Sequence, residues 1–103
     1  MAITSKQRAQ LRGLAMSADT IVQVGKGGIT DPVIESVKTA LKARELVKGR
    51  VLESCEYSPR EVLDALCATC EAEPVQVIGT KFVIFKRNHA DPKIELVKDK
   101  KKK

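Results

Sequence analysis

The chain has 103 residues, of which 43% are hydrophobic and 31% are charged, and its formal net charge is +6. This composition favours one globular domain over a disordered chain, and no apolar run approaches the ~20 residues that a membrane-spanning helix needs. The N-terminus lacks the apolar stretch of a signal peptide, and three cysteines do not make a disulfide framework. We therefore expect a cytoplasmic protein.

The first half of the chain predicts a helix, a strand and a second helix. A capping box at Thr4 begins the first helix, over residues 4–18, and β-branched residues indicate a strand over 20–24. The second helix begins with Thr30 or Asp31 as its N-cap. The apolar face of the first helix comprises Leu11, Leu14, Ala15 and Ala18. The apolar face of the second comprises Val33, Ile34, Val37, Ala40 and Leu41.

The second half predicts a strand, a third helix and a hairpin. Residues 46–52 have strand composition, and a capping box with proline at the first helical position begins a helix over 58–72. Strand-like runs at 74–78 and 81–86 flank the pair Gly79-Thr80, which is typical of a tight hairpin turn.

The predicted order is α-β-α-β-α-β-β. The first two strands are joined through a helix, so they should be parallel with a right-handed crossover, and the final hairpin adds an antiparallel pair. We expect an α/β (α+β) fold, with a four-stranded mixed sheet and helices mainly on one face. One domain should span residues 1–87, followed by a flexible basic tail over 88–103.

The charges are segregated along the chain. Residues 1–52 hold 9 basic and 4 acidic groups, residues 53–73 hold 1 and 6, and residues 74–103 hold 9 and 3. Basic surfaces of this kind attract polyanions, most often nucleic acid, and the acidic segment should lie away from the binding face. Because the chain has only three aromatic residues, contacts should fall on phosphates and sugars rather than on stacked bases.

A glycine loop, formed by Gly25, Lys26, Gly27 and Gly28, joins the first strand to the second helix. Its backbone can approach another molecule closely, and its N–H groups, the helix N-terminus and the lysine all favour a phosphate. The P-loop pattern is absent, and Thr30 replaces the third glycine of a dinucleotide loop, so we expect no nucleotide cofactor. A plain strand–helix turn is the alternative interpretation.

The predicted helices before and after this loop each carry a pair of cations at helical spacing. Arg8 and Arg12 share one flank of the first helix, and Lys38 and Lys42 lie one turn apart on the second. We expect these four residues and the glycine loop to form one continuous binding surface.

Four segments resemble the CRM domain family (chloroplast RNA splicing and ribosome maturation), especially its free-standing bacterial YhbY-type members. They occur in the family order and are SKQRAQLRGLA (5–15), VQVGKGGIT (22–30), ELVK (45–48) and VQVIGTKFVIF (75–85). The resemblance implies an RNA-binding module whose G-x-x-G loop, here Gly25 to Gly28, contacts RNA, with a fold similar to the C-terminal domain of translation initiation factor three. It also implies association with precursors of the large ribosomal subunit.

The three cysteines allow a different interpretation. Cys67 and Cys70 form a C-x-x-C pair that, with Cys55 and His89, could supply four zinc ligands. Both residues of the pair fall on the apolar face of a predicted helix, whereas redox pairs normally lie at an exposed helix N-terminus. We expect no metal, no cofactor and no enzymatic activity.

Three functions remain open from the sequence. The first is a monomeric ribosome-assembly factor that binds ribosomal RNA in large-subunit precursors. The second is a translation-factor-like protein on mature ribosomes, and the third is an adaptor that binds protein rather than RNA. None of them involves a membrane.

Overall fold

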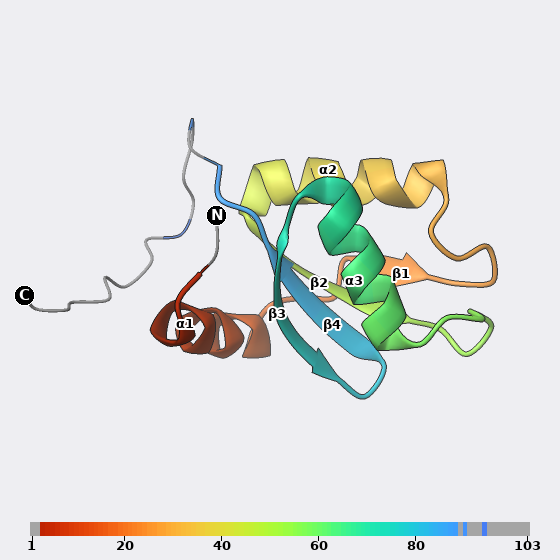
Figure 1. The fold of residues 1–103 in the computed structure, drawn as a ribbon, viewed down its shortest axis with the longest axis horizontal. Coiled ribbons are helices and arrows are strands. Elements are labelled where there is room, and N and C mark those ends of the chain that lie inside the picture. Colours follow the sequence, from red (N-terminus) through yellow and green to blue (C-terminus); the bar gives the residue numbers. More distant parts are fainter. Residues whose placement is uncertain (1–2, 89, 91–93, 95–103) are drawn as a thin grey trace, which may run out of the picture.

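The computed structural model describes residues 3–88, 90 and 94, and its elements follow the predicted order (Figure 1). The helices are α1 (Ser5–Met16), α2 (Asp31–Arg44) and α3 (Pro59–Cys70). The strands are β1 (Val22–Val24), β2 (Leu46–Val51), β3 (Glu73–Ile78) and β4 (Lys81–Phe85). No helix in this part of the chain is long and apolar enough to cross a bilayer.

Local hydrogen bonds begin all three helices where the sequence indicates. The hydroxyl of Thr4 accepts from the backbone N–H of Gln7 at 3.1 Å, and the Gln7 side chain accepts in return from the N–H of Thr4. Ser58 and Glu61 make the same reciprocal pair at the start of α3. Of the two candidate caps of α2, Thr30 is the one that caps the helix. These bonds satisfy N–H groups that have no partner inside the helix.

The sheet has the strand order β1-β2-β4-β3. β1 and β2 are parallel and connected through α2, while β4 pairs antiparallel with both β2 and β3. Gly79, with φ +58°, makes the tight turn between β3 and β4. The predicted α+β fold with a four-stranded mixed sheet is therefore confirmed.

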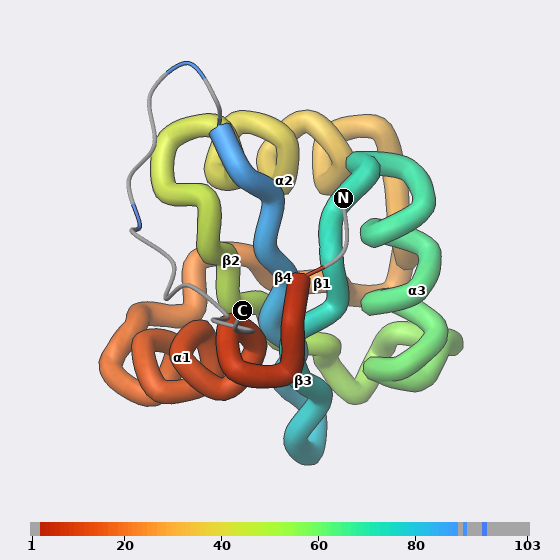
Figure 2. Tube along the Cα trace, turned by 60° about the vertical axis from the view of Figure 1, so that its left-hand side comes forward, coloured from red at the N-terminus to blue at the C-terminus, as the bar shows by residue number. Residues whose placement is uncertain are grey.

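Two helices cover one face of the sheet and one covers the other (Figure 2). The main core lies between the sheet and the pair α2 and α3, and it contains Val37, Leu66 and Phe82. A smaller core on the opposite face packs α1 against β3 and β4. The prediction that the helices lie mainly on one face holds, and α1 is the helix on the other face.

The burial of α1 is narrower than its sequence pattern suggests. Leu11 and Ala15 are buried against the sheet, but Leu14, which we placed on the apolar face, is 43% exposed. Met16 is also exposed. The helix rests on the sheet along a single i, i+4 line, so a residue one position away from that line faces solvent.

Candidate nucleic-acid interface

The glycine loop forms a tight turn at the end of the molecule where β1 leads into α2 (Figure 1). The N–H of Gly28 donates to the carbonyl of Gly25 at 2.9 Å. Lys26 and Gly27 form the exposed tip of the turn, while Gly28 is buried and has φ +68°. The tip is open to a ligand, and the positive φ explains why glycine is needed at the last position.

The connection between β2 and α3 packs against this loop. The ring of Tyr57 lies against Gly28, where an added Cβ would come within 3.1 Å of the ring atom Cε2. An added Cβ on Gly25 would meet Leu52 and Ser54 at ordinary contact distance. Tyr57 is 52% exposed, so an aromatic face is available beside the turn. This contact was not predicted, because no local sequence pattern links Tyr57 to a glycine so far away along the chain.

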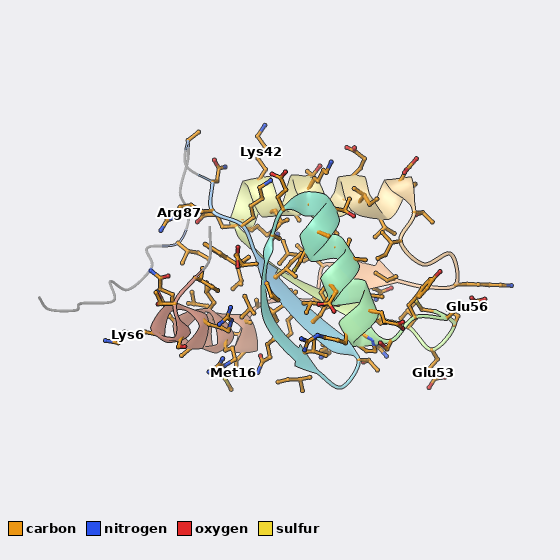
Figure 3. The ribbon with its side chains drawn as sticks, in the orientation of Figure 1. Lys6, Met16, Lys42, Glu53, Glu56 and Arg87 are labelled. Carbon is orange, nitrogen blue, oxygen red and sulfur yellow. The ribbon has the colours of Figure 1, made fainter. Side chains whose placement is uncertain are left out.

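The same connection brings acidic residues to this end of the molecule. Glu53 and Glu56 are exposed, and Figure 3 shows both of them on the side where the glycine loop lies. The expectation that the whole acidic segment lies away from the loop is therefore wrong for this part of it. Lys26 at the tip therefore shares this end of the molecule with two exposed carboxylates.

The cations predicted on the first helix lie on the other face of the sheet. Arg8 is half-buried, and its Nε donates to the carbonyl of Pro74 at 3.1 Å, which ties α1 to β3. Arg8 and Arg60 border a shallow hollow of about 290 Å³ along β3. Arg12 is also half-buried on α1. One N–H donor of the Arg8 guanidinium is therefore already hydrogen-bonded within the protein.

The cations predicted on the second helix lie together in a basic hollow. Lys38 and Lys42 are exposed on α2, and with Lys86, Arg87 and Asn88 they line a hollow of about 360 Å³. Figure 3 shows Lys42 and Arg87 at the same end of the molecule. The lining residues in the described part of the chain include these four cations and no carboxylate. Lys86 and Arg87 were not among the predicted residues, because only the tertiary fold brings them close to α2.

A buried carboxylate holds one wall of this hollow in place. Glu45 ends α2 with φ +65°, and its carboxylate oxygens accept from the backbone N–H groups of Asn88 at 2.6 Å and Ile94 at 2.7 Å. The side-chain amide of Asn88 donates in turn to the carbonyl of Lys42 at 2.8 Å. These bonds fix the segment after β4 beside the end of α2 and so position Arg87 next to the two lysines.

The structure separates the predicted surface into three parts. The glycine loop lies at the N-terminal end of α2, whereas Lys42 lies about three turns further on, or ~16 Å along the axis. Arg8 and Arg12 lie on α1, across the sheet from α2. The members of each pair are close together, but one continuous surface is not formed.

The cysteines are buried or half-buried thiols on α3 and the preceding connection. Burial, together with the carboxylates of Asp64 and Glu73, raises the pKa of Cys67 to about 11. Burial also raises the pKa of Cys70, although Lys38 and Lys86 lower it in part. No group of three or more histidine, cysteine or acidic residues within the described ranges could hold a metal ion, and His89 lies outside those ranges.

The arrangement defines a small α+β domain with a glycine turn between its first strand and second helix. The CRS1 / YhbY (CRM) domain model matches residues 3–86, and the chain belongs to this family.

Similar proteins come from bacteria and archaea. The chain is 40% identical to the probable RNA-binding protein YqeI of Bacillus subtilis, over 91% of this chain and 98% of the relative. It is 33% identical to a probable RNA-binding protein of Methanocaldococcus jannaschii, over 97% and 75% of the two chains. The solution structure of a hypothetical protein from Staphylococcus aureus, described as a candidate for RNA binding, has a TM-score of 0.78 and 38% identity. That match covers 94% of this chain and 100% of the other.

Proposed function

We propose that this protein binds RNA, and that its target is ribosomal RNA in precursors of the large ribosomal subunit, where it acts as an assembly factor. The observation that carries the RNA proposal is the exposed tip of the glycine loop, formed by Lys26 and Gly27 at the start of α2, in a chain of the CRM family. The relatives named as RNA-binding proteins support it. The ribosomal target rests on the family resemblance alone.

The loop suits a sugar–phosphate backbone for two physical reasons. Gly27 has no side chain, so an RNA strand can come close to the backbone N–H groups at the tip, and the N-terminus of α2 adds partial positive charge. Lys26 supplies a full charge beside them. Glu53 and Glu56 would repel phosphates on their side of the loop, which directs the RNA strand away from the β2–α3 connection.

The basic hollow is the second proposed contact. Lys38, Lys42, Lys86 and Arg87 converge there from two segments, and phosphate oxygens are the ligands that such a group of cations prefers. The distance along α2 means that an RNA touching both the loop and the hollow must extend along the helix. Arg8 and Arg12 would contact the RNA only where it continues around to the α1 face.

Cell fractionation with crosslinking tests the proposed target. Tagged protein should sediment with precursors of the large subunit, and sequencing of its crosslinked RNA should return large-subunit ribosomal RNA. Sedimentation with mature ribosomes would instead favour a translation-factor-like role. Recovery without any RNA would contradict the proposal and favour an adaptor that binds protein.

A further inference from the structure

A row of polar side chains crosses the sheet on the face that carries α1. The strand register places Gln23 of β1 opposite Arg50 of β2, and Arg50 opposite Lys81 of β4. All three residues are exposed. Their neighbours Val24 and Phe82 point into the core beneath α2 and α3, so alternation along each strand directs the row to the opposite face.

This part of the sheet is not covered by α1. The helix packs on Val75, Val83 and Phe85, towards the other end of β4, and its last residues reach only the border of the row. There Ala15 and Met16 line a hollow of about 280 Å³ together with Lys48, Lys81 and neighbouring residues of β3. The Nζ of Lys48 donates to the carbonyl of Ala15 at 3.1 Å, which holds this lysine at the helix end.

The row begins beside the glycine loop. Gln23 lies two residues before Gly25, and the parallel strands β1 and β2 end at the same edge of the sheet. Because neighbouring strands are about 4.8 Å apart, Lys81 lies roughly 10 Å from Gln23 across the sheet. The cations of the row are therefore nearer to the loop than Lys42 is.

Within the described residues, the charges in the row have no ion-pair partner. They belong to Arg50 and Lys81, and the two cations are also direct cross-strand neighbours. Like charges directly opposite each other destabilise a sheet, so the fold carries a repulsion that an anion would relieve. The closest acidic residue along β2 is Glu53, which follows the end of the strand and belongs to the connection under the glycine loop.

We propose that Gln23, Arg50 and Lys81, with Lys48 beside them, form a phosphate track that carries the RNA backbone from the glycine loop across the open part of the sheet. This inference rests on the proposed RNA binding and assigns a path to the strand beyond the loop. The row contains no aromatic ring, so the track binds phosphates and does not stack bases.

The test compares two double variants that remove the same charge. Arg50→Gln with Lys81→Gln removes the track cations, and Lys6→Gln with Arg44→Gln removes two exposed cations at the other end of the molecule from the glycine loop. Each protein is titrated with a labelled single-stranded RNA of mixed sequence at several KCl concentrations. The track variant should bind roughly 25-fold more weakly at about 0.1 M KCl, and its salt slope should fall by about 1.4, since each lost contact to a single strand removes about 0.7. The control variant should keep the wild-type slope.

Thermal unfolding of the same variants separates a lost contact from a damaged fold. The track variant should melt at or above the wild-type temperature, because the substitution removes a like-charge pair. Equal RNA affinity and slope in the track and control variants would overturn the track while leaving RNA binding intact. Failure of the wild-type protein to bind the RNA at all would overturn the proposed function itself. A single Lys81→Gln variant, at the first residue of β4, should show about half the change in slope.

Discussion

The two ends of α2 present cations in different settings. At its start, Lys26 stands on a bare glycine turn with carboxylates nearby, and the backbone is accessible. Towards its C-terminal end, two cations of α2 and two from the segment after β4 share a hollow whose described lining contains no carboxylate. If RNA binds as we propose, its affinity at the first site depends on shape, because the strand must approach the backbone closely. Its affinity at the second site then depends on charge, so the two sites should respond differently to salt and to substitution.

The largest expected effect comes from the basic hollow. Replacement of Lys38, Lys42, Lys86 and Arg87 by glutamine should lower the salt slope of RNA binding by about 2.8 and weaken binding roughly 600-fold at about 0.1 M salt. The measurement is a filter-binding titration with single-stranded RNA over a series of salt concentrations. A slope equal to that of the wild-type protein would show that the hollow does not contact RNA.

A glycine substitution in the loop should act on shape rather than on charge. Gly28→Ala places a side chain on a residue with φ +68° and against the ring of Tyr57, which should cost about 1–2 kcal/mol of folding free energy. RNA affinity should fall while the salt slope stays near its wild-type value, because no cation is removed.

Gly13→Ala is the matched control for this substitution. An added Cβ at Gly13 meets nothing within 4 Å, and the residue lies inside α1. Alanine there should raise the free energy of unfolding by up to about 1 kcal/mol and leave RNA binding unchanged. Urea unfolding measures both variants. Gly28→Ala with wild-type affinity would contradict a role for the turn geometry.

Removal of the single charge at the loop tip should have a smaller effect. Lys26→Gln should lower the salt slope by about 0.7 and weaken RNA binding by roughly fivefold at about 0.1 M salt, since one phosphate contact is lost. The side chain is exposed at the tip, so stability should not change. If Lys26→Gln lowered the salt slope as much as the four-residue variant of the basic hollow does, the proposed difference between the two ends of α2 would be wrong.

An effect that does not involve RNA binding concerns a thiol on α3. The pKa of Cys67 is raised from about 9.0 to about 11, so its thiolate fraction at pH 8 is about a hundredfold lower than that of an ordinary thiol. The higher nucleophilicity of a more basic thiolate offsets part of the resulting loss of reaction rate. Iodoacetamide should therefore react with Cys67 about tenfold more slowly than with a small thiol. Mass spectrometry of Cys67 peptides over time measures the rate.

The sign of the corresponding pH effect on stability follows from the same shift. The folded protein holds the Cys67 proton to higher pH than the unfolded chain does, so the free energy of unfolding should decrease as the pH rises from about 9 to about 11. Cys67→Ser should lose this part of the pH dependence. The same slope in both proteins between these pH values would show that another group is responsible.

Short-range features of the chain were predictable because the interacting groups are close in sequence. The caps at Thr4 and Ser58 and the turn at Gly79 need only three or four residues each, and all three occur as expected. Helical periodicity likewise identified Lys38 and Lys42 as neighbours. The same reasoning misplaced Leu14, since periodicity gives a face but not how widely the sheet covers it.

Gly49 is a second residue whose role the local sequence does not indicate. In sequence it only weakens a predicted strand, but in the sheet it lies opposite Phe82, whose ring occupies the space where a Cβ would be. The glycine is a packing requirement of the core. No local pattern reveals it, because the partner belongs to a strand that follows after a whole helix and a hairpin turn.

The sequence by itself determined the order of the elements, their caps, the glycine loop and the CRM resemblance, because each depends on residues that are near one another along the chain. Only the tertiary structure decided which cations share a surface. It placed α1 on its own face, brought Lys86 and Arg87 to α2, and aligned Arg50 with Lys81. The physical reason is that sheet register and helix packing are set by burial of the whole apolar core, so they join charged residues that no short segment contains together.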